Sequence, residues 1–256
     1  LEGLSSHAVT RAYNALGMSL SRKGDQEQAL DWFEKLRSHS WSAGDNWGIG
    51  QSYINAGVTL FRSGDNAEAT NRYEKAEKHA REHGDDQLLS RALHNLASLK
   101  AETDPERALD LLGESQDLKE KIGDAPGLLA SKMTQGIIAV NTGNLNAAED
   151  YFRETVEKAD DLDRRYMKAL ALSNLGSTLV DKDRPSDAIS NYSDARALSE
   201  EEDLRYPLRL ALKGEALARI ETGDYEQADS LFSKLAELEE EAGHDQEAAI
   251  ALHDQG

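Results

Sequence analysis

Residues 136–152 of the chain, GIIAVNTGNLNAAEDYF, contain the pattern from which the fold can be predicted. A small residue, Gly136, is followed by a turn signal at Gly143-Asn144, then by Ala148 and, four residues later, by Phe152. The same order recurs along the chain, with the alanine repeating at intervals of 39 or 40 residues. The six alanines are Ala29, Ala69, Ala108, Ala148, Ala188 and Ala228. A fixed period of this length is typical of a repeat architecture.

Each period divides into two segments of about 20 residues, and each segment is predicted to be an α-helix. The apolar residues of the second segments fall at i, i+4 and i+7, as in Ala29, Phe33 and Leu36, which is the stripe of a helix and not the alternation of a strand. Asp25 and its equivalents stand where a side chain caps a helix start. All four prolines fall at predicted helix starts, where proline is tolerated. We therefore expect an all-α chain.

The predicted organisation is one solenoid over residues 1–245, built from six repeats of about 40 residues. Their approximate limits are 8–45, 46–85, 86–124, 125–164, 165–204 and 205–245. Residues 246–256 are expected to form a partial seventh helix or a C-terminal cap. A single repeat cannot bury its apolar stripe, so stability comes from stacked neighbours. The small residue and the alanine should let two helices approach closely, and the aromatic should fill the gap against the next repeat.

These residues resemble tetratricopeptide repeats. A small residue in the first helix, Gly-Asp at the turn, and then Ala and an aromatic in the second helix are parts of that family's pattern, as is Asn174-Leu175-Gly176. The period of 40 is longer than the usual value of about 34. It is similar to the variant of spindle-orientation adaptors and bacterial peptide-sensing regulators. The resemblance implies a right-handed superhelical α-solenoid whose first helices line a concave face.

Charge and composition exclude several classes of function. The 48 acidic and 29 basic residues give a net charge of −19, which argues against nucleic acid as a partner. Without cysteine there is no disulfide framework and no thiolate metal site. No apolar run is long enough for a membrane span, so we expect a cytoplasmic protein without a membrane partner. The acidic excess also suits a cytosol of high salt, and a halophilic source is a hypothesis.

The sequence lacks the common motifs of catalysis and cofactor binding. No P-loop, His-Glu-x-x-His or Gly-x-Ser-x-Gly pattern occurs, so we expect no enzyme and no cofactor. His39, His79 and His83 could meet as a metal site on stacked second helices, but we favour polar residues near exposed helix ends and predict no metal. Three tryptophans lie within the first 50 residues, namely Trp32, Trp41 and Trp47. They could form a binding hot spot, although packing across the turn between repeats 1 and 2 is favoured.

The family resemblance implies which first-helix positions line the groove. Predicted peptide-binding residues are Arg11, Arg22, Gln51, Asn55, Arg62, Arg91, Asn95 and Asn174. Predicted apolar groove residues are Ile137, Val140, Val180, Leu217 and Ile220. Amide side chains can pair with the backbone of an extended ligand, and arginine can hold carboxylates with two hydrogen bonds. The groove is thus expected to be basic and amide-rich in the first three repeats and apolar in the last three. The alternative is that some of these side chains solvate the groove or brace neighbouring helices.

The leading hypothesis is a non-catalytic scaffold for protein–protein interaction that binds an extended or helical peptide with acidic and apolar stretches. The alternative is a ligand- or peptide-sensing domain of a larger signalling or transcription regulator. A third hypothesis, a phosphatase like some peptide-sensing relatives, would need an additional helical bundle. The sequence leaves the partner's identity, the pathway and the oligomeric state open.

Overall fold

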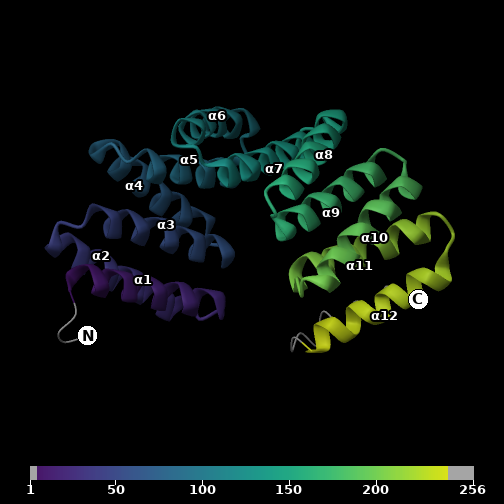
Figure 1. The fold of residues 1–256 in the computed structure, drawn as a ribbon, viewed down its shortest axis with the longest axis horizontal. Helices are drawn as coiled ribbons and strands as arrows, with labels where there is room; N and C mark the ends of the chain where they lie inside the picture. Colours follow the sequence, from purple (N-terminus) through teal and green to yellow (C-terminus); the bar gives the residue numbers. More distant parts are fainter. Residues whose placement is uncertain (1–4, 242–256) are drawn as a thin grey trace. The chain divides into compact units, whose positions relative to one another are not determined.

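The computed structural model describes residues 5–241, which form twelve α-helices joined by short turns (Figure 1). The chain divides into two compact units, residues 1–128 and residues 129–256, with the division inside α7. In unit 1 the helices are α1 (Ser6–Arg22), α2 (Gln26–Ala43), α3 (Asn46–Arg62), α4 (Asn66–His83), α5 (Asp86–Lys100) and α6 (Pro105–Ile122). Next come α7 (Ala125–Asn141), α8 (Leu145–Asp161), α9 (Arg165–Asp181), α10 (Pro185–Glu201), α11 (Arg205–Glu221) and α12 (Tyr225–Glu241).

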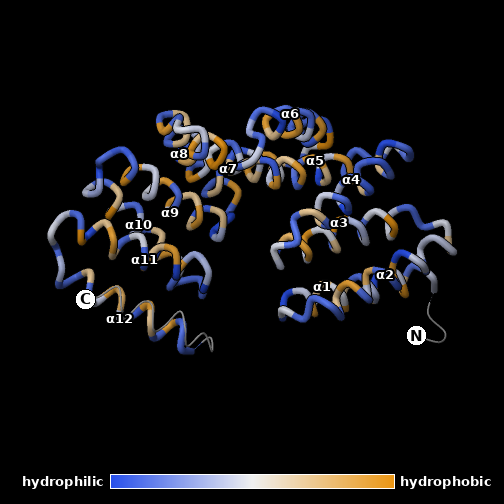
Figure 2. The backbone as a smooth tube through the Cα atoms, turned by 180° about the vertical axis from the view of Figure 1, so that it is seen from behind, coloured by the Kyte–Doolittle hydropathy of each residue, from blue (hydrophilic) through white to orange (hydrophobic). Residues whose placement is uncertain are grey.

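Helices that follow one another in the chain pack as antiparallel neighbours within each unit (Figure 1). The odd-numbered helices, which are the first helices of the pairs, also contact each other: α1 with α3, α3 with α5, and α9 with α11. Hydrophobic and hydrophilic residues are interspersed along the helices (Figure 2). The prediction of an all-α solenoid of helix-turn-helix pairs is confirmed. The six-repeat limits remain a prediction, and the proposed seventh helix at 246–256 lies outside the described residues.

The helix starts follow the capping predicted from the sequence. Asp25 caps α2 by accepting a hydrogen bond from the backbone N–H of Gln28 at 3.3 Å. Asp65 caps α4 in the same way, by accepting a hydrogen bond from the backbone N–H of Glu68 at 3.1 Å. The same type of cap opens α3, where the backbone N–H of Gly48 donates to the carboxylate of Asp45 at 3.1 Å. Pro105 and Pro185 occupy the first turns of α6 and α10, as predicted.

The turns differ between the two units. In unit 1 the second helices end on glycines with left-handed backbone, such as Gly44 with φ of 68°. In unit 2 three turns place an aspartate in the same region, namely Asp163, Asp183 and Asp203, with φ of 51°, 57° and 52°. The helices that follow, α9, α10 and α11, begin without a side-chain cap. These turns therefore carry both backbone strain and a missing hydrogen bond.

The small residue of a first helix packs against the aromatic residue of its own pair. A methyl group built on Gly17 would lie 2.5 Å from the ring of Phe33, and one built on Gly136 would lie 2.5 Å from Phe152. The expectation that the aromatic fills the gap against the next repeat is therefore incomplete. Tyr192 illustrates both contacts, because its ring packs on Gly176 of its own pair and on Gly214 of the following α11. The six repeat alanines are buried, as close helix packing requires.

Candidate functional site

The first helices of unit 1 bring three of the predicted binding residues together. Arg22 of α1 and Asn55 and Arg62 of α3 line one recess of about 90 Å³, here called the α1–α3 recess. The remaining lining residues are Met18, Ser21, Phe33, Val58 and Thr59. Ser21 and Thr59 share a hydrogen bond of 2.8 Å between their hydroxyls, which joins the two helices beside the recess. The recess thus combines two guanidinium groups, one amide and an apolar wall.

The two arginines of the recess are available for a ligand. Arg22 and Arg62 are exposed, and neither makes an ion pair with any residue between 5 and 241. Other arginines of unit 1 are paired: Arg81 of α4, for example, lies 2.8 Å from a carboxylate oxygen of Glu114 in α6. In a chain with 48 acidic side chains, two unpaired neighbouring guanidinium groups form a local anion-attracting surface. Arg11, also predicted, is exposed on α1 but does not line the recess.

Other predicted residues of this face brace neighbouring helices. Arg91 of α5 donates to the side-chain oxygen of Gln51 in α3 at 3.0 Å. Asn55 donates to the side-chain oxygen of Asn14 in α1 at 2.7 Å. Burial lowers the pKa of the Arg91 guanidinium, while the carboxylates of unit 1 nearby act against that shift. For Gln51, Asn55 and Arg91, the bracing alternative therefore describes part of their role.

The two remaining asparagines occupy matching places in different units. Asn95 is half-buried on α5. Asn174 of α9 lies with its amide nitrogen 3.3 Å from the sulfur of Met133 in α7, so this amide also contacts the adjacent first helix. Each amide stands two residues before the small residue of its helix, as Asn55 does.

The apolar residues predicted for unit 2 separate into exposed and packed side chains. Ile137 and Leu217 are exposed on α7 and α11. Val140 and Val180 are half-buried against the cluster that contains Phe152 and Tyr192. Ile220 packs in the same way against the cluster around Phe232. Of the five predicted residues, Ile137 and Leu217 are therefore the two that are exposed.

Sequence reasoning overlooked two apolar residues of the first helices in unit 1. Val58 and Phe61 follow Gly57 by one and four residues, which are the positions that Ile137 and Val140 occupy after Gly136. Both are exposed, Phe61 to 45 %, and Val58 lines the α1–α3 recess. Their positions relative to Gly57 would have indicated both residues from the sequence. The expected division into a basic first half and an apolar second half is therefore too sharp.

The three histidines serve helix packing. The ring nitrogen Nε2 of His79 donates to the backbone oxygen of Asn46 at 3.1 Å, and His83 donates through Nδ1 to the backbone oxygen of His79 at 2.8 Å. His39 makes the equivalent contact with Ser6, 3.2 Å from its backbone oxygen. Among residues 5–241, no group of three or more histidine, aspartate or glutamate side chains is arranged to hold a metal ion.

The tryptophans do not all follow the favoured packing interpretation. Trp32 is half-buried, with its ring 5.4 Å from that of Tyr13 and the ammonium of Lys35 4.5 Å above it. Trp41 is 69 % exposed, and Trp47 is also exposed at the start of α3. Packing across the turn is therefore wrong for Trp41, because this side chain stands in solvent at the end of α2.

Within the described part of the chain, no helix is both long enough and apolar enough to cross a bilayer.

Comparison of the sequence with known families gives two matches. Residues 48–121 match a family model described as tetratricopeptide repeat, and residues 10–36 match a second model with the same description. No curated protein sequence matches the chain.

Comparison of the fold with solved structures gives many matches. The crystal structure of NprR in complex with its cognate peptide NprX has a TM-score of 0.71 and 16% identity, covering 98% of this chain and 72% of that one. A Rap protein complexed with Competence and Sporulation Factor has a TM-score of 0.73 and 13% identity, with 99% and 76% covered. Aspartyl phosphate phosphatase F from Bacillus subtilis has a TM-score of 0.67 and 12% identity, with 98% and 70% covered.

At these identities the structural matches establish likeness of fold. The two matched segments lie in unit 1, and the same helical pairs and small-residue-to-aromatic contacts continue through unit 2. Residues 10–36 and 48–121 therefore belong to the tetratricopeptide repeat family, and the described chain has a tetratricopeptide-repeat-like fold.

Proposed function

We propose that the chain is a non-catalytic interaction module that binds a peptide along the first helices. The observation that carries the proposal is the α1–α3 recess, where Arg22 and Arg62 stand exposed and unpaired, within the described residues, beside an amide and an apolar wall. A carboxylate can accept two hydrogen bonds from one guanidinium, and Val58 and Met18 can pack an adjacent apolar side chain. We assign the recess to an acidic side chain of the partner.

The wider binding surface comprises the residues predicted from the repeat register. In unit 1 it adds Arg11, Gln51, Arg91 and Asn95 of the first helices, and unit 2 has its own candidates, Asn174 and the apolar side chains Ile137, Val140, Val180, Leu217 and Ile220. A partner with an acidic stretch and an apolar stretch matches these two chemistries. Similar folds have been solved with a cognate peptide and with Competence and Sporulation Factor, which supports a peptide as the ligand class.

The second candidate is a sensing domain of a larger regulator. One similar structure, with 16% identity, is described as the apo form of the quorum sensor NprR from B. thuringiensis, and this chain covers 70% of it. Under this alternative, a peptide or small ligand would alter the helical stack and thereby an attached domain. A DNA-binding or kinase domain in the same polypeptide would favour the sensor over the scaffold.

The proposed setting is the cytoplasm of a cell with high internal salt. The acidic excess lies in residues 101–256, with 35 acidic and 17 basic side chains, whereas residues 1–100 have 13 and 12. Repulsion among the carboxylates is screened at high ionic strength.

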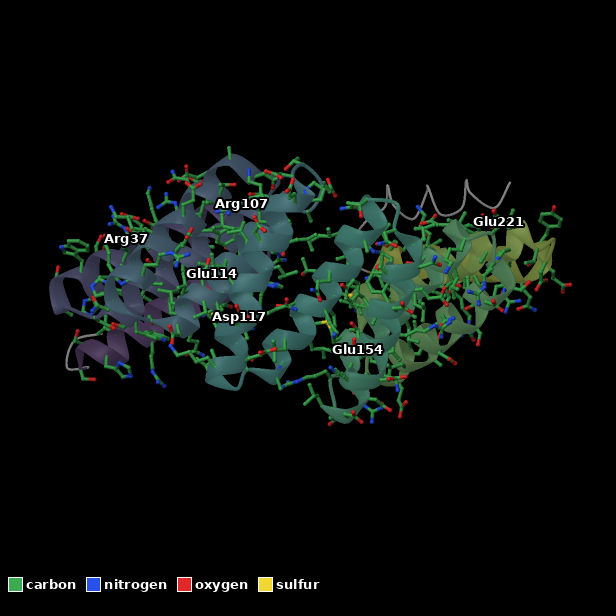
Figure 3. The ribbon with its side chains drawn as sticks, turned by 90° about the horizontal axis from the view of Figure 1, so that it is seen from above. Arg37, Arg107, Glu114, Asp117, Glu154 and Glu221 are labelled. Atoms are coloured by element: carbon green, nitrogen blue, oxygen red, sulfur yellow. The ribbon has the colours of Figure 1, made fainter. Side chains whose placement is uncertain are left out.

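The experiment is affinity capture from an extract of the source cells at native salt, followed by titration calorimetry with the captured peptide. Arg22→Glu with Arg62→Glu should weaken binding at least tenfold, because two attractive charges become repulsive. The matched control is Arg107→Glu with Arg164→Glu, which makes the same charge change at two exposed arginines outside the face (Arg107 is labelled in Figure 3). Equal affinity of both double variants for the peptide would reject the recess as the binding site.

A further inference from the structure

The α1–α3 recess carries two positive charges that no residue of its wall compensates. The guanidinium groups of Arg22 and Arg62 line the same recess of about 90 Å³, and the lining contains no aspartate, glutamate or histidine. Both arginines are exposed, and within residues 5–241 neither of them forms an ion pair. A group that enters the recess therefore meets two cations at once.

The nearest acidic residues along the chain are engaged in other contacts. Asp25 follows Arg22 by three residues and caps α2, and Asp65 follows Arg62 by three residues and caps α4. Neither of these aspartates lines the recess. Residues 1–100 have 13 acidic and 12 basic side chains, so this part of the chain is almost neutral. The local surplus of positive charge thus comes from where the two arginines lie and not from a basic composition.

The hydrogen bonds already formed beside the recess leave donors for a ligand. The hydroxyl of Thr59 donates to the backbone oxygen of Asn55 at 2.9 Å, so in the bond that Thr59 shares with Ser21 the serine is the donor. Both hydroxyl protons are therefore used. One amide hydrogen of Asn55 bonds to Asn14, and the second stays available. Guanidinium and amide donors suit a ligand group that only accepts hydrogen bonds.

Charge distinguishes between the two kinds of acidic side chain that a partner can offer. A carboxylate has one negative charge and two oxygens, so one guanidinium satisfies it and the second stays uncompensated. A phosphoryl group on serine or threonine has about 1.5 to 2 negative charges at pH 7 and three acceptor oxygens. Such a group can compensate both guanidinium groups, and arginine clusters are a general means of binding it. The recess therefore matches a phosphoryl group better than a carboxylate.

We propose that the partner residue bound in the α1–α3 recess is a phosphorylated serine or threonine, so that the interaction depends on phosphorylation of the partner. The phosphoryl oxygens accept hydrogen bonds from Arg22 and Arg62. An aliphatic side chain next to the phosphorylated residue packs on Met18 and Val58, which belong to the apolar wall. This inference rests on the proposed function, because it requires a peptide that binds along the first helices.

The test compares three peptides that differ at one position. They have the sequence acetyl-Ala-Leu-X-Leu-Ala-amide, in which X is phosphoserine, aspartate or serine. In titration calorimetry, the wild-type protein should bind the phosphoserine peptide with a Kd below about 1 mM and the other two at least tenfold more weakly. Inorganic phosphate, as a fourth probe, should also bind at least tenfold more weakly, because it lacks the aliphatic neighbours.

Single substitutions test whether both guanidinium groups are used. Arg22→Gln and Arg62→Gln should each weaken binding of the phosphoserine peptide at least tenfold and affect the aspartate peptide less, because one guanidinium satisfies a carboxylate. The matched control is Arg107→Gln in α6, which removes the same charge from an exposed arginine outside the recess and should leave every affinity unchanged. Circular dichroism should show an intact helical fold for each variant.

The protonation of the phosphoryl group provides an independent measurement. Its second ionisation has a pKa of about 6, whereas a peptide aspartate stays charged down to a pH of about 4. Lowering the pH from 7.5 to 5 should therefore remove most of the advantage of the phosphoserine peptide over the aspartate peptide.

Each possible failure can be told apart from a failure of the proposed function. If the aspartate peptide binds wild type within threefold of the phosphoserine peptide, the phosphoryl assignment is overturned and the peptide site stands. The assignment is also overturned if the phosphoserine peptide has a Kd above about 1 mM, or if inorganic phosphate binds as tightly. Full affinity in either single variant, or an undiminished advantage at pH 5, overturns it as well. The proposed function fails by a different result, namely equal affinity of the two double variants for the captured peptide.

Discussion

The ring of Phe152 in α8 lies so close to Gly136 in α7 that a methyl group on Gly136 would stand 2.5 Å from the ring carbon Cε1. Phe152 is 1 % exposed, and its ring belongs to the cluster that also contains Leu175 and Tyr192. The absence of a side chain at Gly136 is therefore a packing requirement, because no real side chain tolerates so short a contact.

The first prediction follows from this contact. Gly136→Ala should lower the free energy of unfolding by about 1–3 kcal/mol, since the methyl group forces the ring out of place. Gly113→Ala is the control: Gly113 lies within α6, and a methyl group there meets nothing within 4 Å, so it should raise stability by about 0.5–1 kcal/mol. Urea unfolding followed by circular dichroism measures both, and the same sign for both variants would contradict the packing argument.

A second prediction concerns the same ring. Phe152→Ala should lower the free energy of unfolding by about 3–5 kcal/mol, because it opens a cavity in the core of unit 2. Adding Gly136→Ala to this variant should then cost much less than it does in the wild type, because the methyl group enters the space that the ring has left. Additive losses in the urea melts would show that the two residues do not share one site.

The third prediction uses the turn before α9. Asp163 has a left-handed backbone, and Arg164 provides no side-chain cap for α9. At the equivalent positions of unit 1, Gly44 adopts the left-handed backbone without strain and the side chain of Asp45 caps α3. Asp163→Gly with Arg164→Asp should raise the free energy of unfolding by about 1–2 kcal/mol, most of it from the new cap. Thermal and urea melts of the single and double variants measure this, and a loss of stability in Arg164→Asp alone would reject the capping account.

The fourth prediction is a pH dependence centred on Glu149. Hydrogen bonds from Lys182, at 2.6 Å, and from Arg153 lower the pKa of this carboxyl from 4.5 to about 2. Because the pKa is lower in the folded state, the stabilisation is complete above about pH 5 and is lost as the pH falls towards 2. Glu149→Gln should cost about 1–3 kcal/mol at pH 7 and almost nothing near pH 2. A difference between the two proteins that stays constant across this pH range in urea melts would contradict the assignment.

The fifth prediction concerns salt. If the acidic surface is adapted to high ionic strength, the midpoint of thermal unfolding should rise steadily from low to molar KCl, because screening relieves repulsion among the carboxylates. Sucrose at matched viscosity is the control for general solvent effects. A midpoint that stays level or falls with KCl would reject the halophilic hypothesis.

The helices and their pairing could be predicted from the sequence because their causes are local and repeat. Gly136, Asn144, Ala148 and Phe152 specify a close contact, a helix start and a filled interface, and each recurs every 40 residues or nearly so. The unit boundary inside α7 has no such signature, since residues on both sides of Leu128 follow the same periodic pattern.

The candidate sites were predictable only in part. Repeat register indicated that Arg22, Asn55 and Arg62 share one face, and they line one recess. Register did not indicate that Asn55 would bond to Asn14 of the neighbouring helix, because that depends on how the helices cross. The cavity of about 390 Å³ that residues of α2, α3 and α4 line was also missed, because its volume depends on how the helices pack and not on the periodic pattern of any one helix.

Phe33 forms a wall of the α1–α3 recess and also of a second cavity of about 390 Å³, which residues of α2, α3 and α4 line. A single aromatic ring is thus a shared partition, and a ligand that displaces it on one side reshapes the other. A partner side chain that shifts this ring from within the recess therefore also changes the volume on the other side of the ring.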